Sequence, residues 1–199
     1  MDNLPVAPLD GFLKSACTFE ASLILVAVVL GWIADINPFA ALSFSEPAIL
    51  AGVLGTLPLV LLFLALQIAP IKSLQAIRQL LMDTLVSRLQ GLHWTDLLIL
   101  SSIAGIAEEI LFRGVLQPWL EITWGLQAGL WVSSLIFGLL HAITPVYALL
   151  ATLVSVYLGL SLDYGESRNL LTPIVIHGLY DFLAFLMIMR SYNAYSVKQ

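Results

Sequence analysis

The chain has 199 residues, of which 60% are hydrophobic and only 11% are charged, and its formal net charge is −5. A soluble domain usually carries about 25% charged residues. The composition therefore excludes an ordinary soluble protein and predicts an all-α, multi-pass transmembrane helical bundle. The sequence has no basic stripe that would bind nucleic acid, and its one cysteine excludes an internal disulfide and a cysteine metal cluster.

Two long apolar runs occupy the first part of the chain. Residues 1–15 contain prolines and a glycine and predict a short loose or interfacial arm. The runs over 16–34 and 47–69 each suit a membrane span, which requires ~20 apolar residues. The N-terminus lacks the basic start of a secretory signal, so we expect the first run to remain as an anchor.

A third, different segment covers residues 71–94. Its charged and amide side chains alternate with leucine and isoleucine at steps of three and four, which predicts an amphipathic helix lying on a membrane surface. His93 and Trp94 follow at the next return to the membrane, where Trp is common, so we interpret His93 as interfacial. Residues 1–94 are thus expected to form a two-span anchor with one interfacial helix.

Four further apolar runs make six spans in all. Their ranges are 96–118, 124–143, 146–162 and 170–190. We expect a four-helix core over 95–190 and a cytoplasmic tail over 191–199. With six spans, one side of the membrane receives six Lys and Arg residues and the other receives only Arg168. This bias predicts that both termini are cytoplasmic, in a bacterial cytoplasmic membrane.

Three ionisable residues lie in the middle of the third span: Glu108, Glu109 and Arg113. Inserting one charged side chain near the bilayer centre costs roughly 2.5–3.5 kcal/mol of free energy, so three charged residues there require an explanation. Glu109 and Arg113 are one helical turn apart on the same face and can pair. Glu108 is rotated by about 100° from Glu109 and has no partner at helical spacing. The spacing favours a structural Glu109–Arg113 pair and a Glu108 that is free for chemistry, although a purely structural ion-pair cluster would also fit.

Two later spans carry histidines at helical spacing from another notable residue. Phe137 and His141 share a face, and so do His177 and Asp181. A lone histidine near a helix end is usually a packing residue, and His177 with Asp181 could form a helix–helix hydrogen bond, a pair of metal ligands or an oriented histidine. Because buried polar groups in lipid must find one another or water, we expect these groups to share a cavity with Glu108. Such a set can activate a water and stabilise an oxyanion, as amide hydrolysis requires.

In chain order the three motifs read Glu-Glu-x-x-x-Arg, Phe-x-x-x-His and His-x-x-x-Asp. This order resembles the CPBP family, the CAAX prenyl proteases and bacteriocin-processing proteins that are also called the Abi family, over roughly residues 95–190. The resemblance implies an intramembrane endopeptidase in which Glu108 activates the attacking water with His141 as its partner. It assigns His177 and Asp181 to the oxyanion site. The supporting residues would be Glu109, Arg113 and Phe137.

One position departs from the family pattern, because the prenyl-protease branch has Asn where this chain has Asp181. An ionised Asp cannot donate a hydrogen bond to an oxyanion, so Asp181 is either protonated, a group that orients His177, or a metal ligand. Glu108, His141, His177 and Asp181 could together bind Zn²⁺. We favour water activation without a metal or other cofactor.

The expected partners are membrane lipid and a peptide or membrane-protein substrate that reaches the cavity from the membrane or the cytoplasm. His141 lies near the inner end of its span, so either that helix continues past Thr144 or the cavity opens toward the cytoplasm. The rival reading is a non-catalytic membrane immunity or scaffold protein with a structural polar cluster. A proton-coupled carrier that uses the same carboxylates is a third reading.

Overall fold

The computed structural model describes residues 9–196, and within that range it contains helices and no strand. Two π-helical turns, η1 and η2, interrupt the α-helices. The elements are α1 (Leu9–Ala34), α2 (Glu46–Ile68), α3 (Lys72–Leu81), η1 (Met82–Val86), α4 (Ser87–Leu89), α5 (Trp94–Leu111), η2 (Phe112–Leu116), α6 (Gln117–Trp124), α7 (Leu126–Leu140), α8 (Pro145–Ser161) and α9 (Leu171–Ser196).

The six apolar runs correspond to six helical segments, which confirms an all-α membrane bundle. Segments of 24, 23 and 22 residues in α1, α2 and α9 are long and apolar enough to cross a membrane. Helices α5, η2 and α6 follow one another without a break and carry the charged cluster. Helices α7 and α8 are also apolar but have only 15 and 17 residues, which is short for a full span.

Both ends of the chain contain more helix than the sequence predicts. Helix α1 begins at Leu9, so the loose arm expected up to residue 15 is wrong for 9–15, while residues 1–8 lie outside the described range. Helix α9 continues to Ser196, well into the segment that was expected to be a tail. At the start of α1 an apolar face packs on neighbouring helices and extends the element, as Phe12 shows by contacting the hydrophobic cluster that contains Leu97.

The break expected at Pro118 to Glu121 is also wrong, because the helix passes through Pro118 and ends at Trp124. The π-helical turn η2 explains this. At its end the N–H of Gln117 bonds to the carbonyl of Phe112, five residues back rather than four. The next residue, Pro118, lies in the first turn of α6, where a missing N–H is tolerated. The chain turns instead at Gly125, whose φ of 90° is a conformation that glycine adopts readily.

Gly125 forms the turn between two closely packed antiparallel helices, the continuous α5–η2–α6 helix and α7. A Cβ placed on Gly129 would lie 2.9 Å from the Cα of Glu121, so the two helices touch backbone to backbone near the turn. Farther along, the rings of Phe112 and Phe137 meet edge to face with centroids 5.0 Å apart. In each contact the two residues are nearly the same number of positions along the chain from Gly125. The turn therefore sets the register in which the two helices pair.

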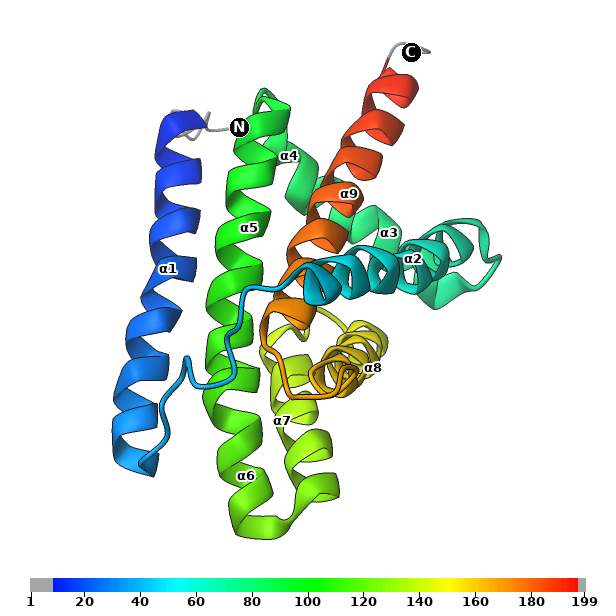
Figure 1. Cartoon of the computed structure of the whole chain (residues 1–199). Coiled ribbons are helices and arrows are strands. Elements are labelled where there is room, and N and C mark those ends of the chain that lie inside the picture. The colour runs from blue at the N-terminus through cyan, green and yellow to red at the C-terminus, as the bar shows by residue number, and fades with distance from the viewer. Residues whose placement is uncertain (1–8, 197–199) are drawn as a thin grey trace.

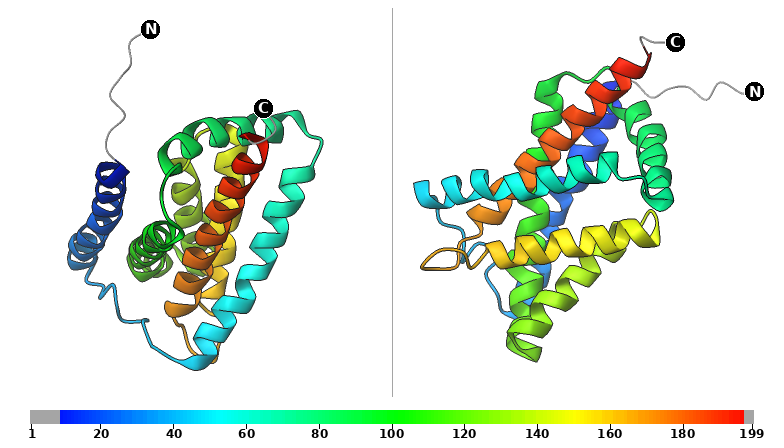
Figure 2. Two further views of the ribbon diagram at one scale, coloured as in Figure 1. Left: turned by 90° about the horizontal axis from the view of Figure 1, so that it is seen from above. Right: turned by 90° about the vertical axis from the view of Figure 1, so that its right-hand side faces the viewer.

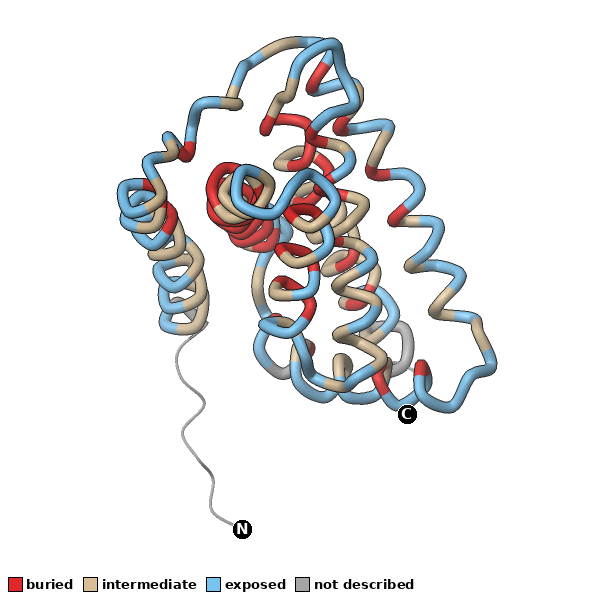
Figure 3. Tube along the Cα trace, turned by 90° about the horizontal axis from the view of Figure 1, so that it is seen from below, coloured by how far each residue is buried: buried red, intermediate tan, exposed pale blue. Residues whose placement is uncertain are grey.

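The other helices pack around this pair. Helix α1 packs on α5, α5 on α9, α9 on α2 and α7 on α8. Figures 1 and 2 show that α2 and α8 run across the direction of α1 and α5 rather than along it. Buried residues gather on the central helices (Figure 3). Large exposed apolar residues are spread along α1 and α2, as expected for surfaces that face lipid.

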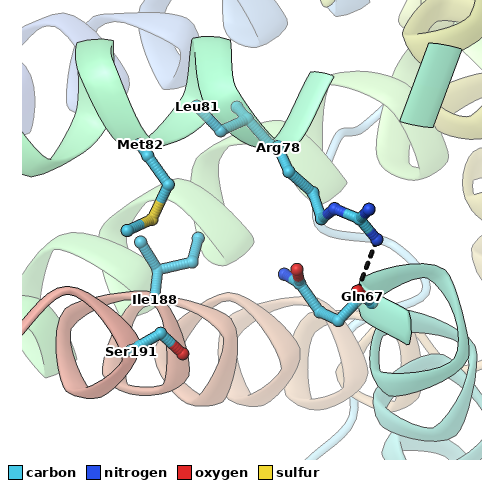
Figure 4. Close-up of a pocket in the computed structure, with 6 residues that line it drawn as sticks. All are labelled: Gln67, Arg78, Leu81, Met82, Ile188 and Ser191. Atoms are coloured by element: carbon cyan, nitrogen blue, oxygen red, sulfur yellow. Dashed lines mark hydrogen bonds between the residues drawn. The ribbon is translucent and has the colours of Figure 1, made fainter. Parts of the chain in front are cut away.

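The amphipathic segment is helical as predicted, with Leu74 and Ile77 buried on its inner face. Arg78 donates hydrogen bonds to the carbonyls of Leu66, Gln67 and Ala69, the last residues of α2 and its cap (Figure 4). A cation is favourable there because the final carbonyls of a helix have no partner within the helix. The cavity beside Arg78 is about 40 Å³, which is enough for little more than water.

His93 lies where the chain re-enters the bundle and acts as the N-cap of α5. Its side chain accepts from the N–H of Thr95, and the Asp96 carboxylate accepts the N–H of His93 at 2.8 Å. This reciprocal arrangement is a capping box. His93 therefore caps the N-terminus of α5, and it lies away from the charged cluster.

The opposite end of the bundle is held by Arg168 in the α8–α9 loop. It donates to Glu121 of α6 at 2.6 Å and to Asp163 at 2.8 Å. These hydrogen bonds, to Asp163 and then to Glu121, raise the pKa of the Arg168 guanidinium above its ordinary value. The pairing fixes the α8–α9 loop against the turn at Gly125.

Candidate active site

The antiparallel register brings Glu108 and His141 together. Glu108 lies 17 residues before Gly125 (125 − 108), and His141 lies 16 residues after it (141 − 125). Helix α7 ends at Leu140, so His141 is its C-cap, and the helix does not continue past Thr144. Because α7 is short, its end lies beside the middle of the long α5–α6 helix. The nearest atoms, Glu108 Oε2 and His141 Nε2, are 3.6 Å apart.

The ring of His141 is fixed by Phe137, one turn earlier. Its Nδ1–H donates to the Phe137 carbonyl at 2.9 Å, and the two rings stack with centroids 4.2 Å apart. With Nδ1 as the donor, Nε2 of a neutral ring presents a lone pair to the Glu108 carboxylate. Two acceptors facing each other need a proton or a hydrogen-bond donor between them. A water ~2.8 Å from both atoms satisfies this requirement.

His177 reaches the cluster because α5 and α9 approach closely at two glycines. A Cβ on Gly105 would lie 2.7 Å from the backbone nitrogen of Gly178, which is closer than real Cβ contacts come. Small residues allow this approach between membrane helices. His177 precedes the contact on α9 and therefore points its ring at the next turn of α5, where Glu109 lies.

The two nitrogens of His177 face two different carboxylates. Nδ1–H donates to Glu109 Oε1 at 2.8 Å, and Nε2 lies 3.6 Å from Asp181 Oδ2, one turn along α9. The sequence predicted that His177 and Asp181 share a face, but the strong hydrogen bond to Glu109 was not predicted. A carboxylate on one ring nitrogen fixes the tautomer and the ring orientation, which leaves Nε2 as the reactive end.

Arg113 completes the buried part of the cluster. Nη1 donates to Glu109 Oε1 at 3.0 Å, and Nη2 donates to the carbonyl and the hydroxyl of Ser155 on α8 at 2.5 and 2.9 Å. The guanidinium also lies over the Phe137 ring, 5.4 Å from its centroid. Glu109 and Arg113 are 0% and 1% exposed, so this is a desolvated ion pair, in which Glu109 Oε2 has no hydrogen-bond partner among the described residues.

Exposure rises across the cluster from Glu109 toward the outside. The side chains of His177 and Glu108 are 8% and 10% exposed, whereas those of Asp181 and His141 are 26% and 35% exposed. The structure therefore brings all seven sequence-predicted residues into one cluster with a closed end and an open end. Glu109 and Arg113 close it, and His141 and Asp181 lie at the opening.

A metal ion was the alternative to a free water. In the part of the chain that the structure describes, no three His, Cys, Asp or Glu side chains are grouped so as to hold one. The hydrogen-bonding geometry gives the reason. Nδ1 of each imidazole is occupied, and the two Nε2 atoms face Glu108 and Asp181 separately instead of a common point.

Three residues near the cluster were missed by the sequence motifs. Ser155 on α8 holds Arg113, and a serine in an apolar helix carried no signal of its own. Tyr147, in the first turn of α8, interacts electrostatically with Asp181 and Glu108. Glu20 on α1 faces the same groups, and its signal was available as an acidic residue inside an apolar span.

Together, the helices and the acid–histidine–arginine cluster at their centre define an all-α membrane bundle with a cluster of ionisable side chains in its interior. Residues 90–183 match the family model "Type II CAAX prenyl endopeptidase Rce1-like". This match runs from the segment before α5 to Asp181 and beyond, and includes every motif residue. Over this segment, slightly less than half of the chain, the sequence is similar to type II CAAX prenyl endopeptidases, in agreement with the resemblance to the CPBP family.

Among curated proteins, "Uncharacterized protein YpbD" of Bacillus subtilis (strain 168) is 35% identical to this chain over 88 residues. The aligned region covers 43% of this chain and 41% of YpbD, so the likeness is confined to less than half of either protein. No solved structure matches the chain. Helices α1 and α2 lie outside the family match.

Proposed function

We propose that the chain is an intramembrane endopeptidase that hydrolyses a peptide bond with a metal-free water activated by Glu108 and His141. One observation carries the proposal. The Glu108 carboxylate and the Nε2 of His141 face each other across 3.6 Å near the open end of the cluster, and the other nitrogen of His141 is already committed to Phe137. A carboxylate and an imidazole placed to share one water are the groups that general-base catalysis needs.

In the proposed reaction, Glu108 and His141 take one proton from the water as its oxygen attacks the carbonyl carbon of the scissile bond. The carbonyl π bond breaks and its electron pair moves to oxygen, which becomes an oxyanion. The proton then passes to the leaving nitrogen, the C–N bond breaks, and the products are a carboxylic acid and an amine. The net change is the addition of one water.

His177 is the group we assign to the oxyanion. Glu109 holds Nδ1–H, so a proton on Nε2 points toward the open end, and Asp181 keeps that proton in place. In this assignment Asp181 orients His177 and has no need to donate to the oxyanion. A charged donor fixed before the reaction stabilises developing negative charge without reorganisation. Glu109, Arg113 and Phe137 support the two histidines.

The substrate in this proposal is a peptide or a membrane-protein segment that enters beside His141 and Asp181. The protein would act in a bacterial cytoplasmic membrane, with lipid around α1 and α2 and with both termini in the cytoplasm. The family model's description, which names CAAX prenyl endopeptidases, supports the endopeptidase class.

The substitution Glu108→Gln tests the proposal because it keeps the shape of the side chain and removes the base. In purified protein in lipid nanodiscs, cleavage of membrane-anchored peptides read by mass spectrometry should fall by about 10²–10⁴-fold. Glu46→Gln, at the exposed start of α2, is the matched control and should cleave normally. A folded Glu108→Gln variant with full activity would refute the mechanism. Loss of wild-type activity on chelation, restored by Zn²⁺, would refute its metal-free form.

The non-catalytic alternative rests on the Glu109–Arg113–Ser155 contacts, which are fully buried and suit a structural role. A scaffold or immunity protein would depend on these contacts and not on Glu108. It would tolerate Glu108→Gln in any assay of its biological role and would fail on substitution of Arg113. The substitutions of Glu108 and Arg113 therefore distinguish an endopeptidase from a scaffold or immunity protein.

A further inference from the structure

Glu20 occupies an unusual position on α1, a helix outside the segment that matches the family. Four residues earlier, Ala16 packs on the cluster that contains Leu97. Seven residues later, Ala27 is fully buried against the cluster that contains Ile110. At 3.6 residues per turn, positions four and seven apart lie on one helix face. Glu20 therefore points at α5 between these two levels.

The carboxylate of Glu20 has no hydrogen-bonding partner for one of its oxygens. Oε2 is buried and unpaired among the described residues. The charge of Glu20 interacts electrostatically with groups on α5, α7 and α9, and with Cys17 on its own helix. The groups on the other helices are Glu108, His141, His177 and Asp181.

The charged groups around Glu20 show which side chains its carboxylate can affect. Glu20 adds a fourth carboxylate to a cluster of described residues that otherwise contains Glu108, Glu109 and Asp181. The one guanidinium, that of Arg113, is hydrogen-bonded to Glu109. Among the described residues, the groups that can carry positive charge and interact with Glu20 are the two imidazoles. An unpaired carboxylate in apolar surroundings is costly, so its charge must be offset by protons on its neighbours or on itself.

We propose that Glu20 is a positioning residue of the active site, which acts through the imidazoles of His141 and His177 by holding protons on them. This inference rests on the proposed function for its meaning, and it gives α1 a role in the chemistry in addition to its role as an anchor. On His177 the stabilised proton is the one presented to the oxyanion. On His141 it is the proton taken from the attacking water, which His141 then passes to the leaving nitrogen.

The test measures the protonation of the histidine side chains directly, and it does not depend on enzymatic activity. The chain has three histidines, so protein labelled with ¹⁵N-histidine in detergent gives a short spectrum that can be followed against pH. In Glu20→Gln, the titration midpoints of His141 and His177 should move by about one pH unit toward acid, the size expected for one charge several ångströms away. His93, which caps α5, is the internal control and should not move.

A second variant tests whether misfolding, rather than loss of the charge, explains the result. Glu20→Met removes both the charge and the unpaired buried oxygen, so it favours insertion of α1 and should give the same shifts. Glu20→Asp keeps the charge and should restore the midpoints toward those of the wild type. Unchanged midpoints in Glu20→Gln and Glu20→Met, or a Glu20→Asp variant that behaves like Glu20→Gln, would overturn the inference.

Activity assays then separate this inference from the proposed function. If the wild type cleaves and Glu108→Gln does not, the pH profile of cleavage in Glu20→Gln should move toward acid by the same amount. An unmoved profile would overturn the role of Glu20 and leave the protease in place. If the wild type cleaves nothing, the proposed function fails, whereas the histidine titrations still decide whether Glu20 controls the imidazoles.

Discussion

Adjacent residues Glu108 and Glu109 have different partners. Glu109 is fully buried, and its Oε1 accepts hydrogen bonds from Arg113 and His177. Glu108 lies nearer the open end of the cluster, where its Oε2 faces Nε2 of His141 at 3.6 Å. A rotation of about 100° between neighbouring residues on one helix produces this difference. One carboxylate can therefore serve structure while the next remains available to a substrate.

The Glu109–Arg113 pair predicts a strong dependence of stability on both partners. Arg113→Met should lower the free energy of unfolding by roughly 3–5 kcal/mol, because it leaves Glu109 buried without its cation. Adding Glu109→Gln should recover much of that loss, since the remaining groups are then neutral. The midpoint of thermal unfolding in detergent measures both effects.

Arg168→Gln is the matched control for Arg113, because Arg168 is also bonded to carboxylates but is 30% exposed. A partly exposed ion pair contributes only about 0–1 kcal/mol, so this variant should unfold close to the wild type. Equal losses for both arginines, or a double variant no better than Arg113→Met, would show that Arg113 does not act through Glu109.

Asp181 gives a second prediction at this scale. Asp181→Asn keeps an oxygen that can accept from Nε2–H of His177, and Asn is the residue of the prenyl-protease branch at this position. Cleavage should therefore stay within about tenfold of the wild type, which is 1.4 kcal/mol in barrier height. Asp181→Ala removes the acceptor and should lose more. The rate of peptide cleavage decides, and an inactive Asp181→Asn would show that the negative charge itself is required.

At the scale of elements, the site depends on two close helix contacts. The turn at Gly125 sets Glu108 opposite His141, and the Gly105–Gly178 contact sets His177 beside Glu109. Neither contact involves a side chain of the ionisable cluster. The geometry of the cluster is therefore held by backbone packing several residues away.

Gly105→Ala should damage both folding and activity. Its Cβ would lie 2.7 Å from the backbone of Gly178, so α9 must move away from α5 and take His177 with it. We expect a loss of about 1–3 kcal/mol in stability, with a fall in cleavage rate. Gly165→Ala is the control, since its nearest neighbour would be 3.6 Å away in an exposed loop. Normal cleavage by Gly105→Ala would show that the glycine contact does not position His177.

At the scale of the whole molecule, much of the architecture follows from the sequence, and the exceptions have local causes. The apolar runs predicted the six helical segments, and the rule that buried polar groups seek one another predicted the cluster. The helix through Pro118 was missed because a π-helical turn shifts the hydrogen bonds by one residue, which no periodicity reveals. The bond between His177 and Glu109 depends on how closely two glycines bring α5 and α9, and a motif does not encode that distance.

The placement of the two helical ends predicts the topology. The start of α1 and the end of α9 lie on the same side of the molecule (Figure 1), as an even number of crossings requires. A fluorescent reporter fused to either terminus should therefore fluoresce in the cytoplasm, and a periplasm-dependent phosphatase fused to either should be inactive. A reporter inserted at Gly165, in the exposed α8–α9 loop, should show the reverse. Opposite results for the two termini would contradict the six-span arrangement.

The early end of α7 has a consequence for the bilayer around the protein. Residues 141–144 connect α7 to α8 beside Glu108, which lies 14 residues, or about 21 Å, from the start of α5. Ala142 and Ile143 are exposed there, although lipid does not tolerate non-helical backbone. We expect lipid tails to withdraw from this corner and leave a hydrated indentation in the membrane. In the proposed function, the incomplete helix would supply hydrolysis with its second reactant, water, at a depth where the surrounding bilayer has none.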